Sequence, residues 1–350
     1  MLQQKVWVQT SAPLFPNIYA FLVGPPGIGK SKSISAIGRY LRELEGLHIA
    51  PTSVTGASLI DALDAAKVRI DVSTKFDERL DYNSMLAMPD ELSALMHEYD
   101  RALVAVLTTV YDCLPYSQTR RHGDISIRIQ HPQLSVLAGD TTSHLLKTLP
   151  EGVWDQGLMS RTLLIFSDDR PMQDDIFDQK EFYSEDLEHD LRSIFALQGK
   201  CRVTESYRDA YNAWRKAGCP PAPTHPRLAH YNSRRSAHLL KLSIIASADV
   251  GDELVLDRVH FDRALGWLLG AERYMPFTFQ VSSSVDSRAI DEVVHWVKEK
   301  GTVSSGQLIM FMAQRMPINT IDRTITLMKD SRMLIVAGVG RFGVESFKVP

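Results

Sequence analysis

The sequence predicts an α/β protein: a parallel sheet flanked by helices, followed by a helical region and a small C-terminal domain. Three observations predict this fold class. A glycine-rich loop stands between an apolar run and a helical stretch, further short apolar runs end in polar residues, and the tail changes to three amphipathic helices and two strands. The expected domains are a core at 1–170, a helical connector and lid at 171–275, a linker at 276–287, and a tail domain at 288–350.

Composition sets the class of protein before any motif is considered. Hydrophobic residues make up 44% and charged residues 23%, which is typical of a soluble globular protein. The formal charge of −3 argues against a protein coated in nucleic acid but permits a local basic face. Cys113, Cys201 and Cys219 are far apart, so they suggest neither a disulfide framework nor a zinc site and fit a reducing cytoplasm. The polar start is unlike a signal peptide, and no apolar run reaches the roughly 18 residues of a membrane span.

The core is organised around a glycine-rich loop that fits the pattern G-x-x-x-x-G-K-[ST]. An apolar run at 18–23 predicts a buried strand before the loop, and a helix is expected at about 31–44 after it. In this setting backbone N–H groups surround a phosphate, the lysine reaches the β- and γ-phosphates, and the final hydroxyl can bind Mg²⁺. The residues of this loop are Gly24, Pro25, Pro26, Gly27, Ile28, Gly29, Lys30 and Ser31. The alternative, a chance glycine loop, is weakened by the strand and helix on either side.

Two adjacent carboxylates, Asp90 and Glu91, end the next apolar run at 84–88. At the carboxyl end of a strand beside the loop, Asp90 is expected to organise Mg²⁺. Glu91 is expected to orient and deprotonate the attacking water. The alternative is a solvated acidic helix start, since Pro-Asp-Glu also begins helices.

Two further apolar runs carry candidate residues at their ends. The run at 134–138 leads to Thr141, whose side chain at a strand tip is suited to sensing the γ-phosphate; the alternative is a simple helix cap. Arg161 stands just before the buried run at 162–166 and is suited to reaching a neighbouring subunit's γ-phosphate. Its alternative is a surface or packing arginine.

A polar, basic turn at 116–124 reads as a hairpin tip, because the alternating strand at 125–129 follows it. Arg120 and Arg121 at this tip are candidates for contact with a nucleic-acid backbone. A solvated loop is the alternative.

The segment at 168–190 is strongly acidic and predicts a solvated connector. Helical segments follow it, interrupted by the proline-rich stretch at 219–226. In the resumed helical block, Arg234 or Arg235 is placed to lean onto the phosphates of the same chain, with ordinary surface arginines as the alternative.

The tail predicts helices at about 290–299, 305–315 and 317–330, then strands at 333–337 and 342–349. Three helices and a wing in so short a segment indicate a winged helix. Nine lysines and arginines stand against seven carboxylates from 282 to 350, so the tail is weakly basic. Arg323 and Arg341 fall where duplex contacts are expected, although winged helices also serve as protein-docking modules.

The order of glycine loop, Asp90-Glu91, Thr141 tip, Ser160-Arg161 strand, helical lid and winged helix resembles the AAA+ P-loop ATPases. Within them it is most similar to a phage and plasmid family of helicase-like proteins related to the minichromosome maintenance helicases. The resemblance implies that Thr141 is a sensor, in a position where these helicases usually carry Asn. It also implies that Arg161 is a finger acting on the next subunit and that Arg234 is the second sensor.

This resemblance sets the functional expectation. The chain is expected to be an oligomeric DNA helicase or translocase, a hexamer that uses ATP and Mg²⁺ on single-stranded or forked DNA, alongside other replication proteins and in the cytoplasm of a bacterial host. Catalysis is expected from Glu91, Thr141 and Arg161. Two alternatives stay open: an ATP-switched initiator or helicase loader, and a protein remodeller whose winged helix docks a partner.

Overall fold

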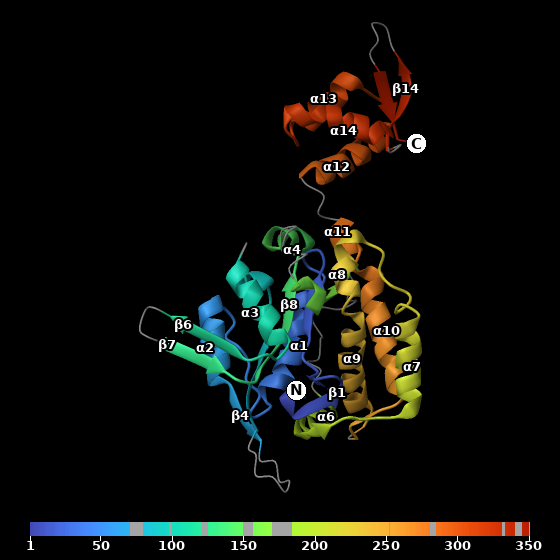
Figure 1. Ribbon diagram of the computed structural model, residues 1–350. Helices are drawn as coiled ribbons and strands as arrows, with labels where there is room; N and C mark the ends of the chain where they lie inside the picture. The colour runs from blue at the N-terminus through green and yellow to red at the C-terminus, as the bar shows by residue number, and fades with distance from the viewer. Residues whose placement is uncertain are drawn as a thin grey trace. The chain divides into compact units, whose positions relative to one another are not determined.

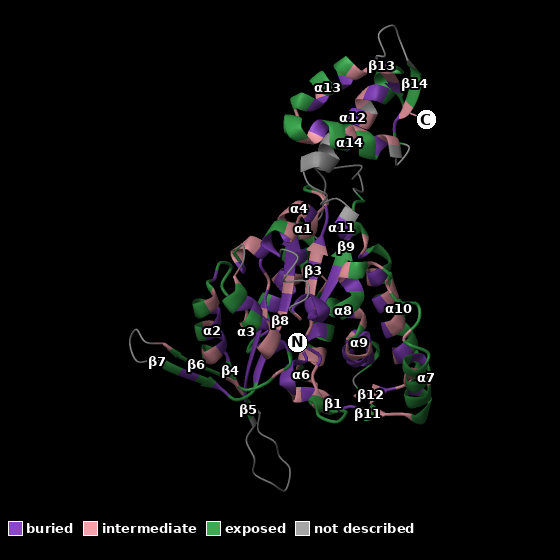
Figure 2. Ribbon diagram, turned by 45° about the horizontal axis from the view of Figure 1, so that its top comes forward, coloured by how far each residue is buried: buried purple, intermediate pink, exposed green. Residues whose placement is uncertain are grey.

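The structure is a computed structural model that describes a chain of two compact units. The described residues are 1–70, 80–97, 100–120, 125–149, 157–169, 184–251, 253–280, 285–330, 333–339 and 345–349. Unit 1 spans Met1–Thr278 and unit 2 spans Phe279–Pro350. Each has its own core of buried residues, as the burial colouring in Figure 2 shows.

A five-stranded sheet in the order β4-β5-β8-β3-β9 forms the centre of unit 1. Its pairs β5–β8, β8–β3 and β3–β9 are parallel, whereas β4 runs antiparallel to β5. The strands are β3 (Tyr19–Val23), β4 (Lys67–Ile70), β5 (Leu80–Ala87), β8 (Pro132–Asp140) and β9 (Thr162–Phe166). The chain is therefore α/β with a largely parallel sheet, as the sequence predicts.

Helices cover this sheet, as Figure 1 shows. The helices between β3 and β9 in the sequence are α1 (Lys30–Arg42), α2 (Gly56–Ala65), α3 (Arg101–Tyr111) and α4 (Thr142–Thr148). Both α1 and α3 pack on β8. The short helices η2 (Leu92–Ala94) and η3 (Met159–Arg161) lead out of β5 and into β9. Strand pairing at the centre is supported by apolar burial: Tyr19, Phe21 and Val23 of β3 are each at most 1% exposed.

The antiparallel strands β6 (Tyr116–Arg120) and β7 (Ile125–Ile129) pair with each other, and β7 packs beside α2. Strand β7 is as predicted, whereas β6 occupies residues that were expected to be part of a turn. Short strands that the sequence pattern did not predict form two small sheets. These strands are β1 (Val6–Gln9), β2 (Pro13–Leu14), β10 (Gly199–Lys200), β11 (Arg202–Val203) and β12 (Val255–Leu256). The first residues form the short helix η1 (Gln3–Lys5).

The helical region packs onto the sheet within the same unit. Its helices are α6 (Glu185–Ala196), α7 (Glu205–Lys216), η4 (Pro226–Leu228), α8 (Ala229–Asn232), α9 (Arg235–Val250), α10 (Arg258–Tyr274) and α11 (Phe277–Gln280). Figure 1 shows α9 and α10 side by side, and α10 contacts β9. The chain divides after Thr278, so this helical region belongs to the same unit as the sheet.

Unit 2 contains three helices and a three-stranded antiparallel sheet in the order β13-β15-β14. Its elements are α12 (Val285–Lys300), β13 (Val303–Ser304), α13 (Ser305–Ala313), α14 (Ile318–Asp330), β14 (Ile335–Val339) and β15 (Glu345–Lys348). Val293, Leu308, Met312 and Phe347 are among its core residues. Since α11 and the start of α12 fall within 276–287, part of the expected linker is helical.

Among the described residues, no helix combines the length and the apolar character needed to cross a membrane.

Candidate functional site

The glycine-rich loop lies between the end of β3 and the start of α1, at the carboxyl end of the parallel strands. The chain leaves β3 for β5 on one side of the sheet and later reaches β9 on the other, so this edge is a topological switch point, where open α/β sheets bind ligands. The N–H of Gly24 donates to the Asp140 carbonyl at 3.2 Å. This bond fixes the start of the loop against β8.

Glycine is required at three positions of this loop. A Cβ on Gly24 would lie 2.0 Å from the Ser167 carbonyl oxygen, so only glycine fits between β3 and the segment after β9. Gly27 and Gly29 have φ of +82° and +91°, a left-handed conformation that other L-residues rarely adopt. The loop also leads directly into α1, whose first N–H groups have no partner within the helix.

Lys30 is the first residue of α1 and folds back over the loop. Its Nζ donates to the carbonyls of Gly24 and Pro25, each at 2.8 Å. Burial lowers the Lys30 pKa, while the charges of Asp140 and Glu91 act to raise it. The ammonium group therefore sits within reach of two carboxylates that come from neighbouring strands.

Asp90 and Glu91 follow β5 at the same edge of the sheet. The backbone at Asp90 passes so close to β8 that a Cβ on Gly139 would lie 2.5 Å from the Asp90 carbonyl oxygen. Both carboxylates are exposed, and Glu91 accepts a hydrogen bond from Ser93 at 3.3 Å. Together with Ile34 and Ser35 of α1 they line a cavity of about 360 Å³. The structure thus brings these carboxylates beside the loop and α1.

Asp140, the last residue of β8, was not among the residues expected in the site. Its carboxylate is 5% exposed and contacts His144 Nδ1 at 2.9 and 3.1 Å. Burial raises the Asp140 pKa, as does the charge of Glu91, whereas His144 and the Thr141 N–H act to lower it. A signal was present in the sequence, because Asp140 and His144 stand four residues apart at the tip of a predicted strand.

Thr141, the residue expected to act as sensor, serves as the N-cap of α4. Its Oγ1 accepts from the His144 N–H at 3.3 Å, and its own N–H donates to Asp140 Oδ1 at 2.7 Å. The structure therefore places a carboxylate one residue before Thr141 in electrostatic contact with Lys30.

Arg161 lies at the opposite edge of the sheet from the loop. It precedes Thr162, which pairs with Tyr19 at the start of β3, so five residues of strand, roughly 16 Å, separate it from Gly24. Its side chain is 8% exposed and pairs with Asp112 through Nη2, while Nη1 donates to the Gly157 carbonyl at 2.9 Å. Arg161 is thus held inside its own unit in this structure.

Arg234 joins Arg161 at this edge. Its Nη1 lies 3.2 Å from Asp112 Oδ1, and its side chain is 33% exposed. Lys241, which burial gives a pKa lowered to about 8, lies close enough to feel the charges of Asp112, Arg234 and Arg161. The structure groups Arg234 with Arg161 and not with Lys30, so three cations meet around Asp112.

Arg235, the alternative to Arg234, is committed to the interior of the helical region. It is 0% exposed and forms a two-pronged ion pair with Glu272, with Nε–Oε1 and Nη2–Oε2 both at 2.7 Å. The hydroxyl of Tyr231 also donates to Glu272 Oε1 at 2.9 Å. Because the guanidinium is buried and fully engaged, Arg235 is a packing residue.

The expected DNA contacts have different outcomes. Arg120 is bound to α2 through Asp61 Oδ2 and the Ala57 carbonyl, each at 2.9 Å, so its guanidinium is directed at the protein. Arg323 is exposed on α14 and forms no ion pair with another described residue. Arg121 and Arg341 lie outside the described residues.

The structure therefore brings the loop at Gly24–Ser31 together with Asp90, Glu91 and Asp140, and it gathers Arg161 and Arg234 at the other edge of the sheet. No protein-family model matches the chain, and no curated protein matches it either.

The close packing of β8 against the Asp90 backbone yields a prediction. We expect Gly139→Ala to lower the free energy of unfolding by about 1–3 kcal/mol, because the new Cβ overlaps a backbone carbonyl that cannot move without shifting β5 or β8. Urea unfolding followed by circular dichroism measures this change. Gly266→Ala on α10 is the matched control: its Cβ meets nothing within 4 Å, and alanine favours a helix, so stability should rise by about 0.5–1 kcal/mol. Equal stability of Gly139→Ala and the parent would contradict the close approach.

Proposed function

We propose that the chain is an ATPase of the AAA+ type that assembles into a ring, six-fold as the resemblance implies, and acts on DNA. One observation carries the proposal: the glycine-rich loop with Lys30 lies at the carboxyl end of parallel strands, where Asp90, Glu91 and Asp140 also emerge. That combination of backbone donors, one cation and several carboxylates is the equipment of nucleoside triphosphate hydrolysis.

The loop residues support binding of the triphosphate. Lys30 now donates to two loop carbonyls, and on binding it would exchange these for phosphate oxygens. The Ser31 hydroxyl and the Asp90 carboxylate are oxygen donors of the kind that Mg²⁺ prefers, and the ion would neutralise charge on the phosphates. Glu91 is exposed, and a serine hydroxyl is its one hydrogen-bond partner among the described residues, so it is free to accept a proton from water.

Asp140 supports the same site through its charge, which acts on Lys30. Its carboxylate is oriented by His144 and by the Thr141 N–H, so it points a fixed negative charge toward Lys30. A charge held in this way opposes the lowering of the Lys30 pKa by burial. We therefore assign positioning of Lys30 to Asp140, with Thr141 fixing the start of α4 and the turn that holds it.

The cation cluster at Asp112 supports a site shared between subunits. Arg161 and Arg234 are too far along β3 to serve the P-loop of their own chain. Three cations around a single carboxylate leave an excess of positive charge, which the γ-phosphate bound to a neighbouring subunit would neutralise. Head-to-tail contact of this kind generates rings.

The remaining architecture supports the finer fold assignment. A helical region follows the sheet, and unit 2 has three helices with strands in the order β13-β15-β14, the arrangement expected of a winged helix. Arg323 on α14 is one of the exposed basic residues of unit 2 that a phosphate backbone could reach, as are Lys298, Lys300 and Lys348.

The nucleotide site is tested first. Lys30→Ala should lower the ATP hydrolysis rate at least about 100-fold, because it removes the cation that stabilises charge on the transferred phosphate. Lys32→Ala, two residues further along the same helix and exposed, is the control and should keep the parent rate. A Lys30→Ala variant as active as the parent would exclude this site.

The shared site is tested by mixing two inactive variants. Lys30→Ala lacks a working P-loop but keeps its arginines, and Arg234→Ala lacks one arginine but keeps its P-loop. If each site is built from two chains, the mixture should recover a measurable fraction of the parent ATPase rate at interfaces where an intact P-loop meets intact arginines. Arg234 is suited to this test because it is partly exposed, so its loss disturbs the core little. No recovery, with both variants folded and assembling with each other, would count against the arrangement.

A second candidate, a remodeller whose tail docks a protein, is favoured by one observation. The surface of α14 carries exposed apolar side chains: Ile318 at its first residue is 77% exposed, and Leu327, one turn after Arg323, is 58% exposed. Exposed apolar side chains suit a protein partner better than a phosphate backbone.

DNA response separates these two functions. For the DNA-acting ATPase, single-stranded or forked DNA should raise the hydrolysis rate several-fold, and the effect should weaken steeply with added salt, since phosphate contacts release counterions. Arg323→Glu should reduce the stimulation of hydrolysis by DNA below that of the parent protein at the same salt concentration. If DNA does not change the ATP hydrolysis rate of the assembled protein at low salt, the remodeller is favoured.

A further inference from the structure

The three cations around Asp112 differ in how far they are exposed. The Arg161 side chain is 8% exposed and Lys241 is 3% exposed, whereas the Arg234 side chain is 33% exposed. A phosphate that approaches from solvent, bound to another subunit, therefore meets Arg234 and not the two buried cations.

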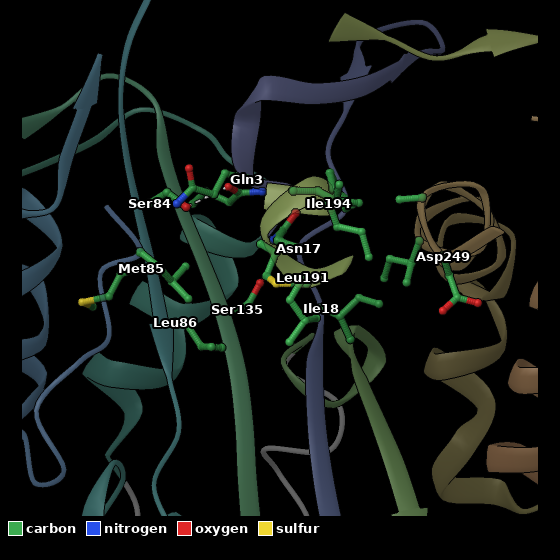
Figure 3. Close-up of a pocket in the computed structure, with 17 residues that line it drawn as sticks. Gln3, Asn17, Ile18, Ser84, Met85, Leu86, Ser135, Leu191, Ile194 and Asp249 are labelled. Carbon is green, nitrogen blue, oxygen red and sulfur yellow. Dashed lines mark hydrogen bonds between the residues drawn. The ribbon is translucent and has the colours of Figure 1, made fainter. Parts of the chain in front are cut away.

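Lys241 is committed to the interior. Its Nζ donates to the Asn17 carbonyl at 2.9 Å and to Asn17 Oδ1 at 2.6 Å, and it lies 4.2 Å from the centre of the Tyr111 ring. Asn17 in turn lies in the wall of a cavity of about 340 Å³ near the amino ends of β3 and β8, as Figure 3 shows. Lys241 therefore acts on Asp112 through its charge and from inside the protein.

Arg161 is fixed by two partners. Its Nε donates to Asp112 Oδ1 at 3.4 Å, its Nη2 donates to Asp112 Oδ2, and its Nη1 donates to the Gly157 carbonyl at 2.9 Å. A guanidinium that contacts both carboxylate oxygens in this way sets the orientation of the carboxylate as well as its position. Arg161 therefore serves as a rigid support for Asp112.

Asp112 stands at a point where a carboxylate does not favour the helix. It is the C-cap of α3, and a negative charge at the carboxyl end of a helix opposes the helix dipole. The surrounding cations offset this unfavourable interaction. The contribution of Asp112 therefore lies in the cations that it holds and not in the stability of α3.

Arg234 depends on Asp112 for its orientation. It is the N-cap of α9, and the bond of its Nη1 to Asp112 Oδ1 at 3.2 Å is the one hydrogen bond of its side chain to a described residue. One turn later, His238 Nε2 donates to the Ser160 carbonyl at 2.9 Å, which ties the start of α9 to the residue before Arg161. Arg234 therefore keeps donors for a phosphate while its position is set by its neighbours.

We propose that Asp112, supported by the buried Arg161, is the positioning residue that orients Arg234 toward the γ-phosphate of a nucleotide bound to the neighbouring subunit. Arg234 touches the phosphate, and Arg161 acts through Asp112. The inference rests on the proposed ATPase with shared sites. It departs from the resemblance, which implies that Arg161 is itself the finger.

Asp112→Asn tests the positioning role, because it keeps the shape of the side chain and removes the charge that both arginines contact. The ATPase kcat of the assembled protein should fall about 10- to 100-fold, with KM for ATP within about twofold of the parent value, since the P-loop of the same chain is untouched. Asp100→Asn, at the other end of α3, is the matched control and should keep the parent rate, because asparagine caps a helix as well as aspartate does. A parent rate in Asp112→Asn, or a loss that lies mainly in KM, would overturn the proposal.

Mixing separates positioning from general damage to the fold. Asp112→Asn should regain a measurable fraction of the parent rate when it is mixed with Lys30→Ala, because its intact P-loop then meets an intact pair of arginines. Mixed with Arg234→Ala it should regain none, since neither chain offers that pair. A subunit with a damaged core would regain nothing with either partner, and this outcome would also contradict the positioning role.

A double variant shows which arginine Asp112 serves. If Asp112 acts through Arg234, adding Asp112→Asn to Arg234→Ala should lower the residual ATPase rate by less than about twofold, because the interaction is already lost. Radiolabelled ATP makes rates of this size measurable. A further loss of about tenfold would show that Asp112 acts through Arg161 on the phosphate, and the assignment of Arg234 would fall.

Failure of this inference and failure of the proposed function give different results. If Lys30→Ala and Arg234→Ala do not restore each other's activity, the shared site falls and the role of Asp112 falls with it. If they do restore it while Asp112→Asn behaves as the parent protein, the shared site stands and only the role of Asp112 is overturned.

Discussion

The register of the parallel strands is the constraint on which this structure depends. Val23, Asp140 and Phe166 pair across β8, β3 and β9, so the residues that follow each strand emerge at one edge. Two glycines then allow the backbones to close on each other, Gly24 against the segment after β9 and Gly139 against the Asp90 carbonyl. The carboxylates of the candidate site are positioned by the second contact, because Asp90 forms it and Glu91 and Asp140 each stand one residue from it.

Charge is distributed unequally between the two edges of this sheet. The carboxyl edge carries Lys30 among Glu91, Asp90 and Asp140, whereas the amino edge carries Arg161, Arg234 and Lys241 around Asp112. Complementary edges of this kind are suited to head-to-tail association, in which a cationic edge of one chain approaches the anionic ligand of the next. The shared-site proposal follows from this separation of charge along β3, since one arginine side chain cannot span the strand.

One residue, Asn17, links the cation cluster to the cavity of about 340 Å³ that lies near the amino ends of β3 and β8. Asn17 lines the cavity and also accepts from Lys241, whose ammonium lies at 2.6 Å from its Oδ1. The same side chain donates to the Tyr111 carbonyl, and Tyr111 packs beside Lys241. Packing around Asn17 therefore bears on both features, because this residue lines the cavity and accepts a hydrogen bond from Lys241 of the cation cluster.

Local sequence determined the elements whose signal is short-ranged. The strand–glycine loop–helix unit, the carboxylates after β5, strand β7 and the three helices of unit 2 could all be predicted, because periodicity and glycine placement act within about ten residues. Tertiary structure decided the rest. The partners of Arg161 and Arg234 are set by Asp112, 49 and 122 residues away, and the burial of Arg235 is set by Glu272 on another helix. The short edge strands escaped prediction because their pairing depends on which distant segments pack together, and neighbouring residues do not contain that information. Asp140 had a local signal in His144 four residues on, but its electrostatic interaction with Lys30 depends on the pairing of β3 with β8.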